Sequence, residues 1–263
     1  MNSLTAEFFN GIATGCRRFD RVSVVINNVS DIESVRKRCD ELARTSVIDG
    51  YCDVAAQLPH ALLLTGLARS RLEPRPHYTD HFLVKVCQPG PRWLVHWDTD
   101  VVLDVPGDWV TPAIALMQRR VDVATATPRW PDGWSLDQER LSTDGAFDLG
   151  YGFSDQVFLI ERARFAAPIY RKFCPASWWY PTSHLTPIFE QRVDAWMRRS
   201  RLQRAVYRQV SYKHDERMAN QPRGTAAQRA RRKAQRLMYE AAQQVPGRFQ
   251  PALHRRPNEK VRS

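Results

Sequence analysis

The chain has 263 residues, of which 43% are hydrophobic, and a formal net charge of +11. This composition is typical of a folded protein with one substantial core and excludes a disordered chain. No apolar run approaches the ~20 residues needed to cross a bilayer, and the amino terminus lacks the pattern of a secretory signal. The five cysteines are scattered and include no Cys-x-x-Cys pair, which favours reduced thiols in a cytoplasmic protein over a disulfide framework or a zinc site.

The positive charge is concentrated toward the carboxyl end. Residues 195–263 hold 18 Lys and Arg against 4 Asp and Glu, whereas residues 1–194 hold 21 against 24. We therefore expect a catalytic or binding domain over residues 1–219 and a basic, helical or disordered extension over residues 220–263. The near-neutral body does not have the charge of a nucleic-acid-binding domain.

The first third of the chain alternates strand and helix patterns. The β-branched run Val22–Ile26 predicts a first strand, and Ser30 or Asp31 can cap a helix that extends to about Ala43. A weaker strand pattern covers residues 47–54. This order predicts an α/β protein with a mostly parallel sheet flanked by helices. Residues 57–76 are ambiguous, and a helix is predicted over residues 78–87.

The segment from Arg92 to Leu103 carries the most informative pattern. Leu94 and Val95 predict a buried strand, which ends in Asp98 and Asp100, separated by one residue. Charge inside an apolar run is costly unless something binds it. An Asp-x-Asp turn at the carboxyl end of a strand can offer oxygen ligands to a hard divalent cation that also holds a diphosphate. The alternative is a solvated acidic turn.

The rest of the chain continues the alternation. We expect a helix over residues 109–120, a strand over 121–125, a long ordered loop over 128–150, a strand within 152–160, a helix over 162–173, an aromatic loop over 178–187, a helix from Ile188 to about Arg201 and a last strand over 205–212 that leads to His214.

Taken in order, these features resemble the family 2-like glycosyltransferases of GT-A fold over about residues 19–215. The features that carry the resemblance are Val22–Ile26, Asp98 with Asp100, the segment Gly152–Arg164, Glu190 and His214. The resemblance implies a single GT-A-type domain. It also implies a hexosyltransferase of polysaccharide biosynthesis that moves a sugar from a nucleotide-diphosphate sugar to a glycan or lipid-linked acceptor, with inversion.

A divalent metal ion, Mn²⁺ or Mg²⁺, is also implied by the resemblance. Asp100, and Asp98 directly or through water, would hold the ion, with His214 as a third ligand, and the ion would neutralise the leaving diphosphate. For His214, the alternative is a hydrogen-bonded surface histidine beside Asp215.

The resemblance places the catalytic base at Glu190, which would take the proton of the acceptor hydroxyl. Asp155 is the second candidate for this role. An acid in the first turn of a helix is also what the helix dipole favours, so Glu190 has a purely structural explanation as well.

The nucleotide would be held at the ends of the first two strands. The resemblance implies contacts from Asn27, Asn28 and Asp53, together with Asp98, although the two asparagines can equally form only a turn. The aromatic residues Trp178, Trp179 and Tyr180 offer a platform for an acceptor sugar or plain core packing.

Other functions compete with this interpretation. A nucleotidyltransferase that makes the activated sugar would need a Gly-rich, basic loop after the first strand, which residues 27–31 do not supply. A nucleic-acid-associated protein would act through its basic end. Residues 225–245 are predicted to form an amphipathic helix whose cations can hold the protein at an anionic membrane surface, about 1 kcal/mol each, or that is simply solvated.

Overall fold

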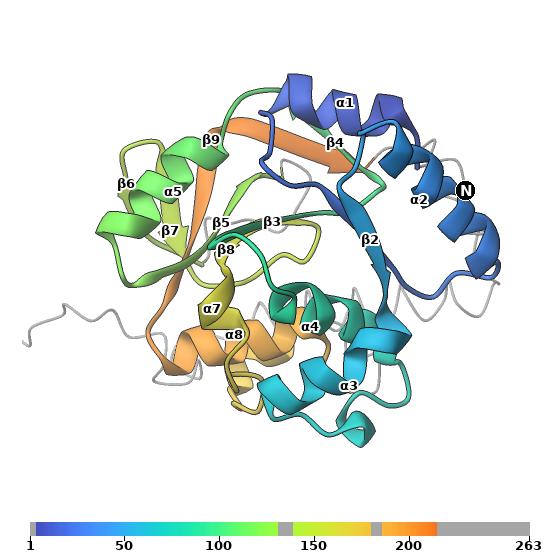
Figure 1. Ribbon diagram of the computed structural model, residues 1–263. Coiled ribbons are helices and arrows are strands. Elements are labelled where there is room, and N and C mark those ends of the chain that lie inside the picture. Colours follow the sequence, from blue (N-terminus) through green and yellow to red (C-terminus); the bar gives the residue numbers. More distant parts are fainter. Residues whose placement is uncertain (1–3, 131–138, 180–185, 215–263) are drawn as a thin grey trace, which may run out of the picture.

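The computed structural model describes residues 4–130, 139–179 and 186–214 (Figure 1). The predicted basic extension, with its helix over residues 225–245, lies outside the described residues. So do residues 131–138 of the predicted long loop and Tyr180, together with the side chains of Trp178 and Trp179. None of the helices in the described part of the chain combines the length and the hydropathy that crossing a membrane requires.

Two β-sheets organise the described residues. A small sheet pairs β1 (Ser23–Ile26) with β2 (Gly50–Asp53) in parallel. The larger sheet has the order β3-β8-β5-β9-β7-β6, with β4 beside the second half of β9. Its strands are β3 (Trp93–Trp97), β4 (Val101–Val105), β5 (Val123–Arg129), β6 (Arg140–Asp144), β7 (Phe147–Gly150), β8 (Val157–Glu161) and β9 (Gln203–His214).

The strand directions correct one expectation. In the larger sheet only β5 and β9 run parallel, and the other described pairs are antiparallel, so the prediction of a mostly parallel sheet is wrong. One cause is local: β6 and β7 are joined by a tight turn at Gly145, whose φ of 54° suits glycine. Short turns join antiparallel neighbours, whereas parallel neighbours need a long crossover. The broader prediction, a mixed α/β domain with an open sheet flanked by helices, is confirmed.

The helices cover the sheets from several sides (Figure 1). They are α1 (Ala6–Gly15), α2 (Ile32–Arg44), α3 (Val54–Thr65), α4 (Asp80–Cys87), α5 (Val110–Arg119), α7 (Arg162–Phe165) and α8 (Phe189–Arg199), with short 3-10 turns η1 (Arg69–Arg71), η2 (Pro76–Tyr78) and η3 (Pro175–Trp179). One core joins α3, α4 and α8 to β8, and a second joins α5 to β5 and β9. A smaller third core joins α2 to β1.

Several elements differ from those expected. The ambiguous region contains α3, which runs through Pro59. The predicted loop over residues 128–150 contains the β6–β7 hairpin, and the predicted helix over 162–173 is only the single turn α7. Pro168 explains the early end, because proline disfavours a helical residue before it and lacks an N–H. Helix α1 was not predicted at all.

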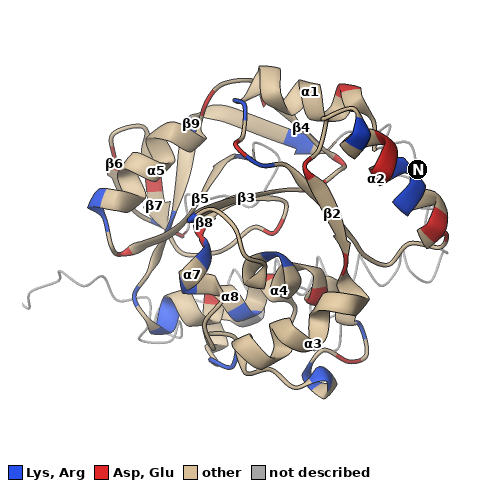
Figure 2. Ribbon diagram, viewed as in Figure 1, with Lys and Arg blue, Asp and Glu red and all other residues tan. Residues whose placement is uncertain are grey.

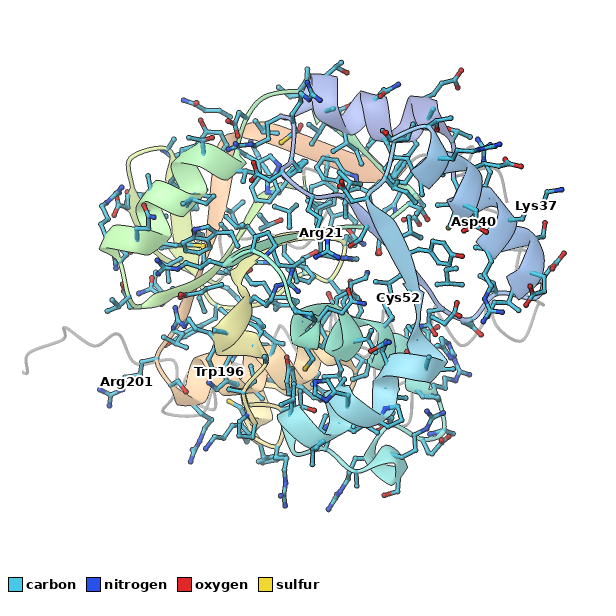
Figure 3. All side chains as sticks on the ribbon, in the orientation of Figure 1. Arg21, Lys37, Asp40, Cys52, Trp196 and Arg201 are labelled. Carbon is cyan, nitrogen blue, oxygen red and sulfur yellow. The ribbon has the colours of Figure 1, made fainter. Side chains whose placement is uncertain are left out.

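Among the described residues, no strand of the small sheet pairs with a strand of the larger sheet. Strands β1 and β3 belong to separate sheets, and a cleft of about 1180 Å³ is lined by both. Figure 3 shows Arg21, just before β1, near the centre of the molecule beside this gap. The cleft is therefore bordered by the unpaired edges of two strands, and it contains several of the predicted site residues.

Candidate active site

The cleft brings together residues from distant parts of the sequence. Asn27 and Asn28 at the end of β1, Asp98 after β3 and Asp155 before β8 all line it. The other predicted site residues do not line the cleft. They are Asp53, Asp100, Glu190 and His214, and each lies next to a cleft residue or to its neighbour in the sequence.

A tight turn presents the two carboxylates of the Asp-x-Asp motif. The Asp98 amide donates a hydrogen bond to the Gln156 carbonyl (2.9 Å), and the Val101 amide donates to the Asp98 carbonyl (3.2 Å). The first bond continues the β3–β8 ladder, and the second closes the turn before β4. Both bonds use backbone atoms, so the two aspartate side chains stay available for other contacts.

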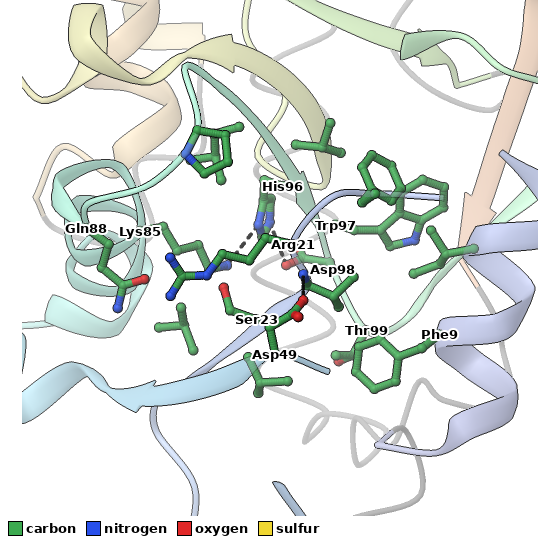
Figure 4. Close-up of a pocket in the computed structure, with 18 of the residues that line it drawn as sticks. Phe9, Arg21, Ser23, Asp49, Lys85, Gln88, His96, Trp97, Asp98 and Thr99 are labelled. Carbon is green, nitrogen blue, oxygen red and sulfur yellow. Dashed lines mark hydrogen bonds and ion pairs between the residues drawn. The ribbon is translucent and has the colours of Figure 1, made fainter. Parts of the chain in front are cut away.

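Asp98 ends a chain of buried polar contacts that the sequence did not predict (Figure 4). The Lys85 ammonium donates to His96 Nδ1 (2.8 Å), which leaves His96 Nε2–H to donate to Asp98 Oδ1 (2.9 Å). Burial lowers the pKa of His96 to about 4 and the pKa of Lys85 to about 8. Burial alone would raise the pKa of Asp98, but His96 and Lys85 outweigh it and the pKa lies below its usual range. At neutral pH the ring is uncharged and acts on Asp98 as a hydrogen-bond donor.

Asp100, the second aspartate of the motif, lies beside His214. Because β4 and β9 pair with Val101 opposite His214, the Asp100 carboxylate lies 3.4 Å from His214 Nδ1. The Gln156 side-chain amide donates to His214 Nε2 (2.8 Å), so a neutral ring carries its proton on Nδ1, facing Asp100. The side chains of Asp100 and His214 are 42% and 38% exposed, so both can be reached from solvent.

The predicted metal ligands are present but not assembled as one set. Asp98 Oδ1 is directed at His96, whereas Asp100 faces His214. Within the described residues, no group of three or more His, Cys, Asp or Glu side chains is arranged to hold a metal ion. The donor types suit Mg²⁺ or Mn²⁺, but in the described structure the three side chains do not form one ligand set.

The two candidate bases are in direct contact. The Asp155 amide donates to Glu190 Oε1 (3.1 Å), and the two carboxyl groups also share a hydrogen bond. Burial, then the nearby Asp98 carboxylate, raises the pKa of Asp155 to about 7. Burial, then the Asp155 carboxylate, raises the pKa of Glu190 well above its usual range. Two carboxyl groups this close cannot both ionise cheaply, so the pair holds a proton near neutral pH.

The amino-terminal end of α8 fixes Glu190 in this position. Phe189 is fully buried, and its ring stacks on the Phe82 ring with 4.5 Å between centroids. The buried Arg192 guanidinium donates to three carbonyls, those of Pro187, Tyr170 and Arg71. The first turn of α8 is therefore held by packing on one side and by three hydrogen bonds on the other.

A buried ion pair further along α8 fixes the turn before Asp155. Asp194 is fully buried, accepts from the Gly152 amide (3.0 Å) and pairs with Arg198 (2.8 Å). Arg198 also pairs with Glu139 (2.6 Å). Gly152 has a φ of 93°, and a Cβ there would lie 3.0 Å from the Glu139 carboxylate, so both its conformation and its neighbours favour glycine.

The predicted nucleotide contacts lie at the ends of β1 and β2. The Asn27 side-chain amide donates to the carboxylate of Asp80 (2.9 Å) and to the His77 carbonyl (3.3 Å). Asn28 is exposed and has a φ of 50°, a conformation that asparagine tolerates better than most residues. Asn27 thus has a structural role in joining β1 to the segment before α4, while the Asn28 side chain faces solvent.

Asp53 lies next to Asn27, because β1 and β2 pair with Ile26 opposite Asp53. One oxygen, Oδ2, accepts from Arg36 Nε (3.1 Å). The other, Oδ1, is buried and has no hydrogen-bond partner among the residues that the structure describes. A buried carboxylate oxygen without a donor is costly to the folded state.

Lys85, His96 and Gln156 were missed by the sequence analysis. Two weak signals were present: His96 is two residues before Asp98, so both face the same side of a strand, and Lys85 is the single cation within the apolar run of α4. Gln156 offered no signal of its own. Comparison of the chain with protein-family models, curated proteins and solved structures finds no match.

Proposed function

We propose that this protein is a glycosyltransferase that moves a sugar from a nucleotide-diphosphate sugar to a hydroxyl of a glycan or lipid-linked acceptor. The observation that carries the proposal is the convergence of Asn27, Asn28, Asp98 and Asp155 on one cleft, with Glu190 bonded to Asp155. These residues come from four separate segments, and the resemblance to GT-A enzymes assigns each of them to the same reaction.

The nucleotide end of the donor would lie near β1 and β2. There Asp53 ends β2, with one carboxylate oxygen bonded to Arg36 and the other buried. The exposed Asn28 amide offers both a donor and an acceptor. This arrangement supports binding of a nucleoside without specifying which base it carries.

The diphosphate end would lie near Asp98 and Asp100. A divalent ion bound there, with His214, would neutralise the charge that develops on the leaving diphosphate. The Asp100–His214 contact supports this part of the proposal, although Asp98 bonds to His96 instead.

Proton transfer would fall to the Asp155–Glu190 pair. Of the two, Asp155 lines the cleft and has a pKa near 7, which suits a base that takes a proton from the acceptor hydroxyl. Glu190, whose pKa lies well above its usual range, would stay protonated while Asp155 is ionised, and would keep Asp155 in place. This assignment reverses the order expected from the sequence, in which Glu190 came first.

Binding of UDP, GDP and dTDP to the purified chain, measured by calorimetry with and without Mn²⁺, tests the proposal. We expect metal-dependent binding of one nucleotide, weakened about tenfold or more in Asp100→Asn, because a charge-assisted contact to the ion is lost. Asp104→Asn, which removes an exposed carboxylate of β4 that pairs with Lys213, is the matched control and should bind as the wild type does.

The same preparation separates binding from turnover. Asp155→Asn should retain nucleotide affinity and lose about 10²–10⁴-fold in the rate of sugar transfer or donor hydrolysis. Absence of binding by all three nucleotides, or binding indifferent to Mn²⁺ and to Asp100→Asn, would reject the proposed donor site.

A further inference from the structure

Three cationic side chains gather inside the cleft, apart from the Asp100–His214 pair. Arg21 precedes β1, Lys85 lies on α4 and Arg162 begins α7, and all three line the cleft. Figure 4 shows the Arg21 side chain extending from the segment before β1 toward the side of the cleft where Lys85 lies. The three charges thus come from separate elements and share one space.

Arg21 has neither an ion pair nor a hydrogen bond with any other residue that the structure describes. Two other cations that line the cleft do have partners: Arg92 pairs with Glu161 (2.8 Å), and Arg17 donates to Thr111 (2.6 Å). Arg21 is exposed to the cleft, so its five N–H donors are free to meet a ligand.

Lys85 uses only part of its donor capacity. Its ammonium donates to the neutral ring of His96, and two N–H groups remain. The carboxylates of Asp98 and Asp155 lie near enough to favour its charged form, but neither forms an ion pair with the ammonium. The charge of Lys85 is therefore not cancelled by direct contact with an acid.

Arg162 is held rigidly at the border of the same space. Its guanidinium donates to the Pro91 carbonyl (3.2 Å) and to the Lys85 carbonyl (2.5 Å). Its Nη2 lies beside Gly90, where an added Cβ would come within 3.1 Å, so a larger residue there would crowd the guanidinium. The proximity of Arg21, after burial, lowers the pKa of Arg162, which is the effect expected of neighbouring like charges.

We propose that Arg21, Lys85 and Arg162 form an oxyanion site in the cleft that binds a phosphate group without a metal ion. All three line one cleft, and cations that share a space repel one another unless an anion lies among them. Their combined charge and their approach from three elements suit a tetrahedral, multiply charged phosphate better than a planar carboxylate. The site goes beyond the proposed glycosyl transfer, because it uses neither the Asp-x-Asp turn nor the Asp155–Glu190 pair.

Calorimetric titration of the full chain with inorganic pyrophosphate, in EDTA at low ionic strength, tests this site. We expect binding by the wild type and about tenfold or more weaker binding by Arg21→Gln. Arg92→Gln is the matched control, since it removes a cleft cation that already has an acidic partner, and its affinity should stay within about twofold of the wild type. Equal binding by wild type and Arg21→Gln, an equal loss in Arg92→Gln, or no binding to the wild type would overturn the proposal.

Lys85→Met gives a second, independent arm. It should also lose pyrophosphate affinity, and its thermal unfolding is measured alongside because it removes a partner of the buried His96. Arg21→Gln changes an exposed side chain and keeps the test decisive if Lys85→Met unfolds.

Two further measurements separate this site from the proposed donor site. Asp100→Asn should leave pyrophosphate binding in EDTA unchanged, whatever it does to metal-dependent nucleotide binding, so failure of one proposal does not imply failure of the other. Competition by UDP for pyrophosphate in EDTA would identify the phosphate as that of a nucleotide. Absence of competition would identify a free phosphate or diphosphate as the ligand, and either result supports the site.

Discussion

Asp155 and Glu190 are acids whose pKa values both lie above the usual range of a carboxyl group. Their carboxyl groups share a hydrogen bond, and the pKa of each is raised by burial and by a neighbouring acid. A protonated Glu190 beside a titrating Asp155 gives the cleft a base that works near neutral pH. The same arrangement lowers the stability of the folded chain near neutral pH, because both acids would be ionised at that pH if they were exposed to water.

That cost predicts how stability changes with pH. The pKa of Glu190 is higher in the folded than in the unfolded chain, so its contribution to stability is present below the unfolded pKa and lost as pH rises through the folded one. Glu190→Gln cannot ionise and avoids this loss. We expect the free energy of urea unfolding of Glu190→Gln, relative to wild type, to increase from pH 5 to pH 8.

Glu7→Gln is the control, because Glu7 is an exposed acid in the first turn of α1. Its difference from wild type should not change between pH 5 and pH 8. The lowered pKa of His96 makes stability rise with pH below pH 6.5, which is the opposite of the effect of Glu190. His96 is present in all the variants, so its effect cancels in the comparison. A difference between Glu190→Gln and wild type that stays constant, or that falls with pH, would contradict a protonated Glu190.

The sequence indicated some site residues and missed others for physical reasons. Asp98, Asp100 and His214 stand out because charge or a titratable ring follows an apolar strand. The expected closeness of Asp100 and His214 is confirmed, since β4 and β9 pair at Val101 and His214. Lys85 and His96 are buried by contacts that only the fold creates, so their altered pKa values could not be inferred from neighbours in the sequence.

Helix α8 both supplies Glu190 and supports the turn before Asp155. Its first turn holds Glu190, its middle holds Asp194, and its last turn holds Arg198. Asp194 accepts from the Gly152 amide, so the helix also fixes the turn that leads to Asp155. The Arg198 guanidinium lies 4.9 Å from the Tyr151 ring centroid, which adds a contact on the other side of Gly152.

Loss of the cation in this ion pair should be severe. Arg198→Met leaves the fully buried Asp194 carboxylate without its charged partner, and we expect a loss of about 3–5 kcal/mol in the free energy of unfolding. Chemical denaturation followed by circular dichroism measures it. Arg199→Met, next along the helix and exposed, should change stability by no more than about 0.5 kcal/mol. Similar values for the two variants would show that the Asp194–Arg198 pair is not needed.

Elements with strong local signals were predicted and those with weak ones were not. Helix α2 has a capping aspartate, Asp31, and apolar residues at helical spacing, and it forms as expected. Helix α3 is apolar on several sides and contains Pro59, so periodicity does not reveal it. The β6 strand is mostly polar and exposed, and the pairing that makes it a strand comes from β7.

The order of strands in the larger sheet is a property of the whole molecule. Strand β9 pairs with β5 and β7 along its first half and with β4 along its second half. Such pairings join residues up to about a hundred positions apart. The sequence could therefore predict that strands exist, but not which strands pair with one another. The mostly parallel sheet was expected from the first βαβ pattern, and that pattern describes only β1 and β2.

Over the whole molecule, the charged residues are distributed unevenly. Figure 2 shows Lys and Arg interspersed with Asp and Glu over the described residues, for example along α2, where Arg36 pairs with Glu33 and Arg38 with Glu41. Residues 220–263, outside the described part, contain 11 of the 39 Lys and Arg but only 2 of the 28 Asp and Glu. Any attraction to an anionic surface should therefore depend on this segment.

Removal of residues 220–263 tests this dependence. We expect the full chain to sediment with phosphatidylserine-containing vesicles at low salt, and the truncated chain to stay in solution, because each cation near the surface contributes about 1 kcal/mol. Neutral phosphatidylcholine vesicles are the control and should bind neither form. Equal sedimentation of both forms would contradict a role for the segment, and stronger retention on RNA than on vesicles would favour nucleic acid as its partner.

The cleft between β1 and β3 also bears on how the natural ligand can be found. Because it is lined by both sheets, a molecule that fills it touches two sheets that no strand pairing joins in the described part of the chain. A ligand that binds only the folded chain raises its free energy of unfolding, by about 2.7 kcal/mol at a concentration one hundred times Kd. Melting temperatures recorded against a panel of nucleotides, nucleotide sugars and phosphates would thus rank candidate ligands before any reaction is known.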